Sequence, residues 1–254
     1  MAKTGQPSTA RVASAQRSLA ILDVLADEPS LGTNEIARRL GTSASTTSRQ
    51  LATLVEAGLV EHVPATGRYR LGIRLVALAT SVLARLDVRA IAHPHLEALA
   101  ADLGETATLS VPADPDAITV DVVRSPRYIA DGSRLGRPSI AHATAAGKVM
   151  LAFDGVRAAR QLQAYTPRTI TDPGELEAEV EGVRKRGWAD AFEERELGLN
   201  AIAAPVWSSD GALAGIIALQ GPIPRFGKAA ARAALPSLRE HAAAISSELG
   251  SQSR

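Results

Sequence analysis

The chain has 254 residues, of which 46% are hydrophobic, and its 28 basic and 27 acidic side chains give a formal net charge of +1. This length accommodates one or two domains with buried cores, and a charge so close to zero indicates no particular partner. The absence of cysteine excludes a disulfide framework and thiol chemistry, so a reducing cytoplasm is the expected location. We expect no membrane partner, because the first residues lack a signal-peptide core and no segment approaches the ~20 apolar residues that span a bilayer.

The chain begins with a polar stretch, residues 1–11, which we expect to be a disordered tail. The apolar spacing that follows predicts an amphipathic helix over residues 14–26. Pro29 comes shortly after this segment, and proline cannot continue a helix. The inner side of the helix is predicted to carry Leu19, Leu22 and Leu25.

A second, shorter helix is predicted from Thr33, which can cap its start, to Leu40. Gly41 can adopt the left-handed conformation that closes a helix, and Thr42 or Ser43 then offers a hydroxyl to cap the next one. The turn between the two helices is therefore only about three or four residues long, as a helix-turn-helix requires.

The next predicted helix, residues 44–57, carries Leu51, Leu54 and Val55 on its inner side. Its outer face is small, polar and almost free of acid, so it can approach phosphate without repulsion. Arg49 and Gln50 have the donor geometry for guanine and adenine edges, and the hydroxyls suit phosphates. The side chains expected to contact DNA from this region are Ser43, Ser45, Thr46, Thr47, Arg49 and Gln50.

Residues 59–63 and 68–71 alternate with a period of two around a turn, which predicts a β-hairpin. Arg68 and Arg70 fall on one face of it, as expected for a wing that touches the DNA backbone or minor groove. Residues 12–72 thus read as a winged helix-turn-helix, with 8 basic and 6 acidic side chains in residues 1–72 against 20 and 21 beyond. The alternative is plain helical packing with a solvated Ser/Thr face.

Residues 73–87 are predicted to form a linker helix with a broad apolar stripe. Such a stripe must be covered, and the same helix of a second chain would cover it while pairing two DNA half-sites. An ordinary interdomain helix is the alternative. The stripe consists of Ile73, Val76, Leu78, Ala79, Val82, Leu83 and Leu86.

The remaining residues, 88–250, predict an α+β domain with a largely antiparallel sheet, because strands precede and follow a block of helices. Predicted strands cover residues 106–111, 117–123, 128–130, 188–192, 201–206 and 213–219. Predicted helices cover residues 91–102, 142–153, 156–165, 174–186 and 228–249.

Catalytic signatures are missing from this second domain, which has no phosphate loop, His-Glu-x-x-His pattern or Gly-x-Ser-x-Gly elbow. His93 and His95 flank a proline without nearby carboxylates, which is more typical of surface or packing residues than of a metal site. Glu193 and Glu194 are more typical of a solvated loop than of an acid/base pair. We therefore predict no catalytic residue, metal or cofactor. The small residues that open the helix at 142–148 leave backbone N–H groups accessible to a carboxylate.

Nine short motifs occur in an order and spacing that resemble the IclR family of bacterial transcription regulators, over about residues 12–250. They are SLAILDVL at 18–25, EIARRLG at 35–41, GRYRLG at 67–72, GET at 104–106, HATAAGK at 142–148, TPRTIT at 166–171, EE at 193–194 with LG at 197–198, IAAPV at 202–206, and GP at 221–222.

The resemblance implies an N-terminal winged helix-turn-helix, a linker helix and a C-terminal effector domain similar to the GAF fold. It implies dimers, often paired into tetramers, on pseudo-palindromic operators, with a small organic acid or aromatic catabolite as effector. Carried over by motif, the backbone amides of Ala145 and Ala146 would meet a carboxylate, with Tyr128 and Asp131 on the opposite wall. The remaining pocket positions fall on Ala191, Ala201, Ala218 and Gln220.

The three alanines depart from family members that bind two- or three-carbon keto acids, which have polar side chains here, including an acid at the position of Ala191. We therefore expect a larger or more apolar ligand, with Tyr128 available for stacking and Gln220 as a polar contact. Two other classes stay open at this point. One is an enzyme acting on a small organic acid, with the N-terminal domain serving dimerisation, and the other is a structural DNA-binding protein without an effector.

Overall fold

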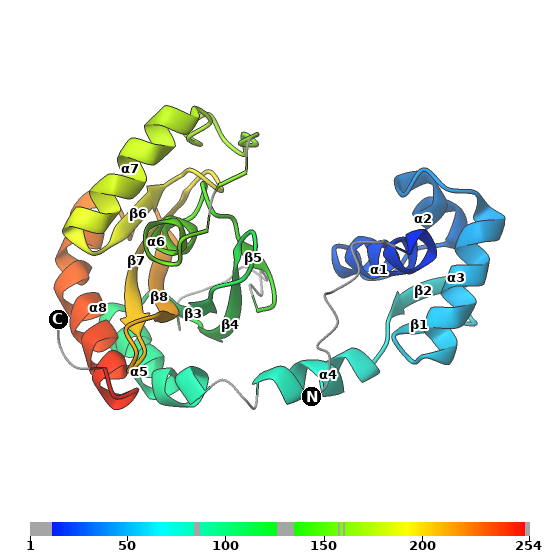
Figure 1. The fold of residues 1–254 in the computed structure, drawn as a ribbon, viewed down its shortest axis with the longest axis horizontal. Coiled ribbons are helices and arrows are strands. Elements are labelled where there is room, and N and C mark those ends of the chain that lie inside the picture. Colours follow the sequence, from blue (N-terminus) through cyan, green and yellow to red (C-terminus); the bar gives the residue numbers. More distant parts are fainter. Residues whose placement is uncertain (1–11, 84–86, 126–134, 157, 160, 252–254) are drawn as a thin grey trace, which may run out of the picture. The chain divides into compact units, whose positions relative to one another are not determined.

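The computed structural model describes residues 12–83, 87–125, 135–156, 158–159 and 161–251. Its chain divides into two compact units, Met1–Arg85 and Leu86–Arg254, each with its own core (Figure 1). No helix within the described ranges is long and apolar enough to cross a membrane.

The first unit is a three-helix domain with a hairpin and a following helix. Its elements are α1 (Ala13–Ala26), α2 (Thr33–Arg39), α3 (Ala44–Glu56), β1 (Val60–Val63), β2 (Arg68–Leu71) and α4 (Arg74–Leu83). The hairpin is antiparallel, with Val60 opposite Leu71 and Val63 opposite Arg68. An additional bridge joins Leu31 to Tyr69, so the segment before α2 is attached to the hairpin. The predicted order of helix, helix-turn-helix and wing is confirmed.

The turn between α2 and α3 forms as the sequence predicts. Gly41 has φ 62°, and the hydroxyl of Ser43 accepts a hydrogen bond from the backbone N–H of Thr46 at 3.2 Å. At the start of α2, the carboxylate of Glu35 reaches back to accept the N–H of Gly32 at 2.8 Å. At the start of both helices, a side-chain oxygen therefore accepts a hydrogen bond from a backbone N–H group that has no partner within the helix.

The core of the first unit differs from the predicted one at two positions. Leu19 is 61% exposed and Val55 is 36% exposed, although both were expected to face inward. Adjacent helical residues are about 100° apart, so Leu19 lies on the side of α1 opposite Ile21. The buried side chains that hold the domain together are Ile21, Leu25, Leu31, Ile36, Leu51, Leu54 and Val60.

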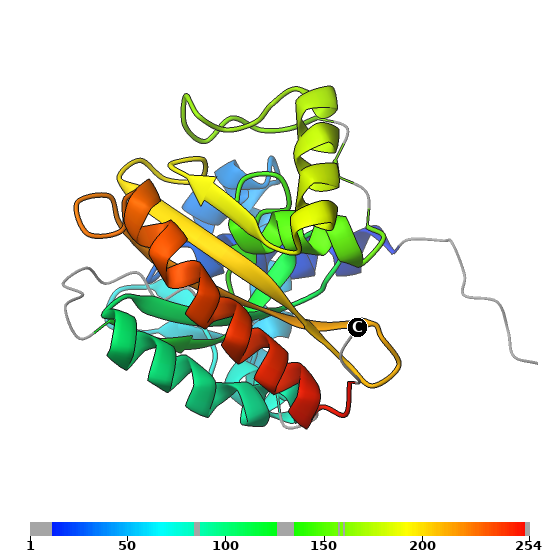
Figure 2. The same ribbon diagram turned by 90° about the vertical axis from the view of Figure 1, so that its left-hand side faces the viewer.

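The second unit is built on one six-stranded sheet in the order β5-β4-β3-β8-β7-β6, in which every pairing is antiparallel. The strands are β3 (Thr106–Val111), β4 (Ala117–Val123), β5 (Pro138–Ser139), β6 (Ala189–Phe192), β7 (Leu199–Trp207) and β8 (Leu213–Pro222). Helices α5 (Asp87–Leu103) and α8 (Lys228–Glu248) cover one face of this sheet (Figure 2). On the other face lie α6 (Ala145–Phe153) and α7 (Pro173–Arg186). The predicted α+β class with an antiparallel sheet is confirmed.

One predicted helix does not form. The described residues between 156 and 165 follow an irregular path, from which Val156, Ala158 and Leu162 still pack on the core. Gly155 precedes them with φ 72°, which ends α6 without starting a new helix, and Pro167 follows. The apolar spacing of this segment therefore reflects burial and not helical structure. The strand predicted at residues 128–130 lies outside the described residues.

Candidate DNA-binding surface and effector site

The outward face of α3 presents the polar side chains expected to meet DNA. Ser43, Ser45 and Arg49 are exposed, as is Ser48, while Thr46 is half-buried. In the part of the chain that the structure describes, the guanidinium of Arg49 makes no hydrogen bond or ion pair. A planar cation with five N–H donors is therefore available at the surface of this helix.

Two of the predicted contact residues are placed differently. Thr47 is fully buried, with its hydroxyl 2.9 Å from that of Thr42, and Gln50 is 9% exposed, with its amide nitrogen 3.5 Å from the carbonyl oxygen of Ser14. Both lie on the inward stripe with Leu51 and Leu54, since residues three, four and seven apart share a helix face. The prediction that Gln50 faces outward is wrong, and burial keeps the side chains of both Thr47 and Gln50 away from the surface expected to contact DNA.

Both arginines of the hairpin are already engaged within the first unit. Arg68 donates to the hydroxyl of Ser30 at 3.2 Å and pairs with Glu35 at 2.8 Å. Arg70 makes two hydrogen bonds to Glu61, at 2.9 and 3.1 Å. The hydrogen bond from Arg70 lowers the pKa of Glu61, and the pKa of Glu35 is lowered first by the N–H of Gly32 and then by nearby arginines. Each arginine of the wing is therefore paired with a carboxylate of its own unit, which partly neutralises the charge that a DNA phosphate would meet.

In the second unit, the start of α6 leaves two backbone donors open. Thr144 caps the helix by accepting the N–H of Gly147 at 3.0 Å, and Lys148 N–H bonds to the carbonyl of Thr144 at 3.0 Å. The N–H groups of Ala145 and Ala146 have no acceptor within the described ranges. Gly147 is needed here because a Cβ would lie 2.3 Å from the carbonyl oxygen of Ile140. Open N–H groups at the positive end of a helix form a site for an anion.

The predicted alanines gather against this helix start. Ala145, Ala146, Ala191 and Ala218 are buried in one cluster, with Ala201 packed against it. The sheet register explains the grouping, because one transverse row runs Ala191, Ala201, Gln220 and Thr106 across four neighbouring strands. Gln220 is half-buried in that row. Tyr128 and Asp131 lie outside the described residues.

Sequence reasoning missed two threonines on β3 that share this face of the sheet. Thr108 stands opposite Ala218, and Thr106 stands opposite Gln220. Thr106 accepts the N–H of Ser125 at 3.2 Å, whereas the hydroxyl of Thr108, a residue only 6% exposed, makes no hydrogen bond to the described residues. The alternation of residues along β3 was the available signal, since Ala107 and Leu109 point to the opposite face.

The expectation that Glu193 and Glu194 form a solvated loop is wrong for Glu194. Glu194 is 9% exposed, and its carboxylate lies 2.7 Å from the ammonium of Lys148, a residue that is 1% exposed. Lys148 also donates to the carbonyl of Asp190 at 3.0 Å. Burial raises the pKa of Glu194, although Lys148 acts to lower it. Glu194 is therefore a buried partner of α6 and not a free acid or base.

Three of the sequence motifs meet around this ion pair. The hydroxyl of Thr166 donates to the carbonyl of Glu193 at 2.6 Å, and that of Thr169 donates to the carbonyl of Glu194 at 2.5 Å. These bonds hold the loop after β6, where Glu193 has φ 58°, against the segment before α7. The motifs at 142–148, 166–171 and 193–194 thus form one packed polar cluster that fixes α6.

The two histidines that flank Pro94 face different partners. His93 Nδ1 lies 2.8 Å from Asp121, and His95 Nδ1 lies 2.9 Å from Nδ1 of His241. The described residues contain no group of three or more side chains able to hold a metal ion. The expectation that these histidines have no nearby carboxylates is wrong, because His93 lies beside Asp121 and His95 Nε2 lies 3.0 Å from Glu248.

Comparison with known proteins shows that both units of the chain match the same protein family. Residues 14–64 match the IclR helix-turn-helix domain, and residues 80–247 match the C-terminal domain of bacterial transcriptional regulator IclR. The chain belongs to the IclR family of bacterial transcriptional regulators. This IclR-family chain is 35% identical to the glycerol operon regulatory protein of Streptomyces griseus over 246 residues, covering 94% of this chain and 97% of that protein. It is 31% identical to transcriptional repressor IclR of Escherichia coli K12, covering 87% and 84%.

The same fold occurs in a solved IclR homologue from Microbacterium hydrocarbonoxydans, crystallised as a complex with 4-hydroxybenzoate. Its TM-score is 0.76 at 24% identity, with 93% of this chain and 99% of that one covered. Because the matched relatives are named regulators and the family match includes the helix-turn-helix, this IclR-family protein is a DNA-binding transcription regulator and not an enzyme.

Proposed function

We propose that this IclR-family regulator binds a pseudo-palindromic operator as a dimer, or as a pair of dimers, and responds to an organic or aromatic acid. In this proposal residues 12–72 bind DNA, residues 73–87 link the domains and residues 88–250 bind the effector. The effector changes operator affinity because it binds one of two states of the dimer more tightly than the other.

We propose that Arg49 contacts the base edges of the operator and that the hydroxyls of Ser43, Ser45 and Thr46 contact its phosphates. The exposure of Ser43, Ser45 and Arg49 supports the assignment, and Thr46 is half-buried in the first turn of the same helix. Arg68 and Arg70 would contact the DNA backbone while remaining paired with Glu35 and Glu61.

For dimerisation, we assign the apolar side of α4. Ile73, just before the helix, is 82% exposed, and Leu78 within it is 50% exposed. Leucine and isoleucine side chains in water are stabilised when a second apolar surface covers them. The same helix of another copy would supply that surface and set the spacing of two recognition helices.

For the effector, the observation that carries the proposal is the pair of open N–H groups on Ala145 and Ala146, facing a sheet lined with alanine. The N–H groups would bind the carboxylate. In this proposal the alanine side chains form the apolar wall of the site, and Gln220 and Thr108 offer hydrogen bonds to a second polar group. A ring with a carboxylate and a hydroxyl fits this set of contacts better than a two-carbon acid.

The test is operator binding in the presence of acids. An operator sequence selected from random DNA is titrated with the full-length protein, with and without 4-hydroxybenzoate, benzoate, glyoxylate or pyruvate. We expect an aromatic acid to change operator affinity and the small keto acids to have no effect. In Ala146→Phe the response should disappear while operator affinity without acid stays the same. A response to glyoxylate or pyruvate alone would contradict the effector assignment.

A further inference from the structure

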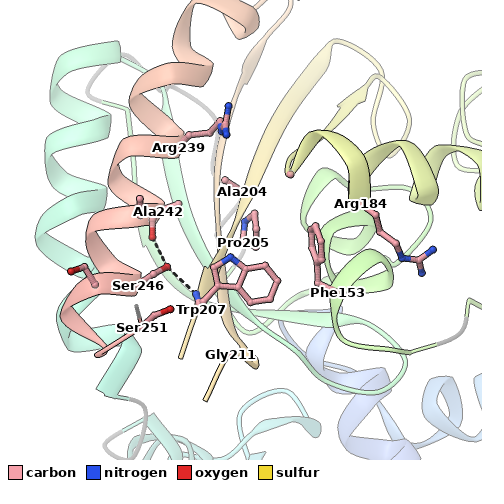
Figure 3. Close-up of a pocket in the computed structure, with 13 residues that line it drawn as sticks. Phe153, Arg184, Ala204, Pro205, Trp207, Gly211, Arg239, Ala242, Ser246 and Ser251 are labelled. Atoms are coloured by element: carbon pink, nitrogen blue, oxygen red, sulfur yellow. Dashed lines mark hydrogen bonds between the residues drawn. The ribbon is translucent and has the colours of Figure 1, made fainter. Parts of the chain in front are cut away.

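The second unit contains a cavity of about 530 Å³ at the far end of α6 from the proposed effector site (Figure 3). Residues of α6, α7, β7 and α8 line it, among them Phe153 in the last turn of α6. Ala145 and Ala146 lie in the first turn of the same nine-residue helix, and a rise of 1.5 Å per residue puts the two ends roughly 12 Å apart. The cavity is therefore separate from the open N–H groups of α6.

The cavity exists because β6 is shorter than its neighbour. The pairing of β6 with β7 begins at Ala189 and Ala203, whereas β7 continues to Trp207. The last four residues of β7 thus have no strand beside them on that edge within the described part of the unit. One of them is Pro205, which lacks an N–H group and makes a poor template for an added peptide strand. The edge suits a small molecule better than an extended peptide.

The charged groups lining the cavity are Arg184 and Arg239, and none of the described lining residues is acidic. Arg184 is committed to the end of α6, since it donates to the carbonyl of Ala152 at 2.9 Å and pairs with Glu181 at 3.3 Å. Arg239 is exposed and makes no hydrogen bond or ion pair with the described residues. Arg239 is thus a cation available to a ligand in this cavity.

Two aromatic side chains line the same cavity. The rings of Trp207 and Phe153 meet edge to face, with centroids 5.2 Å apart and an interplanar angle of 78°. The backbone N–H of Trp207 donates to the hydroxyl of Ser246 at 2.9 Å, and that hydroxyl donates to the carbonyl of Ala242 at 2.7 Å. These bonds, drawn in Figure 3, hold the end of β7 on α8.

We propose that this cavity is a second small-molecule site, which binds a planar aromatic carboxylate. The carboxylate pairs with the guanidinium of Arg239, whose donors match two carboxylate oxygens, and the ring packs on Trp207. The cavity volume lies within the range of about 300 to 1,000 Å³ that ligand sites occupy. The proposal does not depend on the effector assignment, because it uses different residues at the other end of α6.

Trp207 provides a direct readout. The chain has two tryptophans, and Trp188 does not line the cavity, so the W188F variant leaves Trp207 as the only tryptophan. Full-length W188F is titrated with benzoate and, separately, with neutral benzamide while Trp207 fluorescence is recorded. We expect a saturable change with benzoate. Binding should weaken about tenfold or more for benzamide, or when R239Q is added, because a charged hydrogen-bonded partner is lost.

Matched controls separate this site from others. R232Q changes an exposed arginine of the same helix that does not line the cavity, and should leave the benzoate titration unchanged. A146F, or A218L if A146F does not fold, fills the proposed effector site and should also leave it unchanged. Loss of the signal in A146F or A218L with retention in R239Q would place benzoate at the effector site and overturn the proposal. Equal binding of benzamide, or a signal that follows protein concentration instead of benzoate, would also overturn it.

Discussion

The helices α3 and α6 both begin at a hydroxyl cap, yet they present different atoms for recognition. α3 turns Ser45, Ser48 and Arg49 toward solvent, so its side chains are the available contacts. In α6 every residue from Ala145 to Ala152 is buried, and the N–H groups of Ala145 and Ala146 are the donors without an acceptor among the described residues. Recognition by side chains can be altered by substituting one residue at a time. Recognition by backbone N–H groups depends on the contacts that position the whole helix.

The largest effect should come from removing the charge that holds α6 in place. Lys148→Met leaves the carboxylate of Glu194 buried without its partner, and we expect a loss of roughly 3 to 5 kcal/mol in the free energy of unfolding. Chemical denaturation of the single variant and of K148M/E194L measures it. The double variant should recover most of the loss, and a double variant as unstable as the single one would contradict this explanation.

The same variant carries a pH signature. Burial raises the pKa of Glu194 in the folded chain, so folding favours its protonated form. The cost of burying this group therefore grows as pH rises from the unfolded pKa through the raised folded one. We expect the deficit of K148M, relative to the unaltered protein, to be smaller at about pH 5 than at about pH 8.

Close packing of α6 gives the second prediction. Gly147→Ala places a Cβ against the carbonyl oxygen of Ile140, and such overpacking costs about 1 to 3 kcal/mol. Gly182 in α7 is a matched control, because the nearest atom to a Cβ there is 3.5 Å away, on the end of Arg186. G182A should be neutral or stabilising by about 0.5 to 1 kcal/mol in the same denaturation assay. Equal effects of the two variants would show that α6 is not tightly held.

For α3 we expect an effect on binding and not on folding. Arg49→Ala should weaken operator binding by about 1 to 3 kcal/mol, because a bidentate contact to a base edge is lost. R49K keeps the charge without the planar fork, so it should restore salt-dependent binding but not sequence preference. Competition between the selected operator and unrelated DNA separates the two outcomes. Wild-type discrimination in R49K would exclude a base-reading role.

The smallest effects compare the two caps. Ser43→Ala removes the oxygen that accepts the N–H of Thr46, and should cost about 1 kcal/mol of stability with a secondary loss of operator affinity. Thr144→Ala removes the corresponding bond to Gly147 and should cost a similar amount. We expect T144A to change the response to acids while leaving operator binding intact. An unchanged acid response in T144A would argue against recognition at the start of α6.

Local chemistry accounts for what the sequence predicted well. The left-handed conformation of Gly41 and the hydroxyl cap of Ser43 determine the turn of the helix-turn-helix. β3 and β4 have the predicted bounds because polar and apolar residues alternate along each of them. The errors concern side chains whose surroundings lie far away in the sequence. Gln50 points inward toward Ser14, 36 residues earlier. The spacing of Gln50 from Leu51 and Leu54 places it on the inward stripe of α3, but its partner on α1 is not encoded within the helix.

The proposed effector site could likewise be predicted only where it depends on neighbouring residues in the sequence. Small residues at 145 and 146 pointed to an open helix start, but the pairing of Lys148 with Glu194 spans 46 residues. Thr108 joins the alanine surface solely through the sheet register with Ala218. Such pairings follow from how strands and loops assemble, and motif spacing does not encode them.

The transverse row of Ala191, Ala201, Gln220 and Thr106 bears on how this regulator can be repurposed as a biosensor. These four side chains sit at one level of four adjacent strands, whose backbone hydrogen bonds do not involve them. A library that varies Ala191, Ala201 and Gln220 would change the side chains on this face of the sheet while keeping Thr106, whose hydroxyl accepts the N–H of Ser125. Because the recognition helix lies in the other unit, the reporter operator would stay the same for every new analyte.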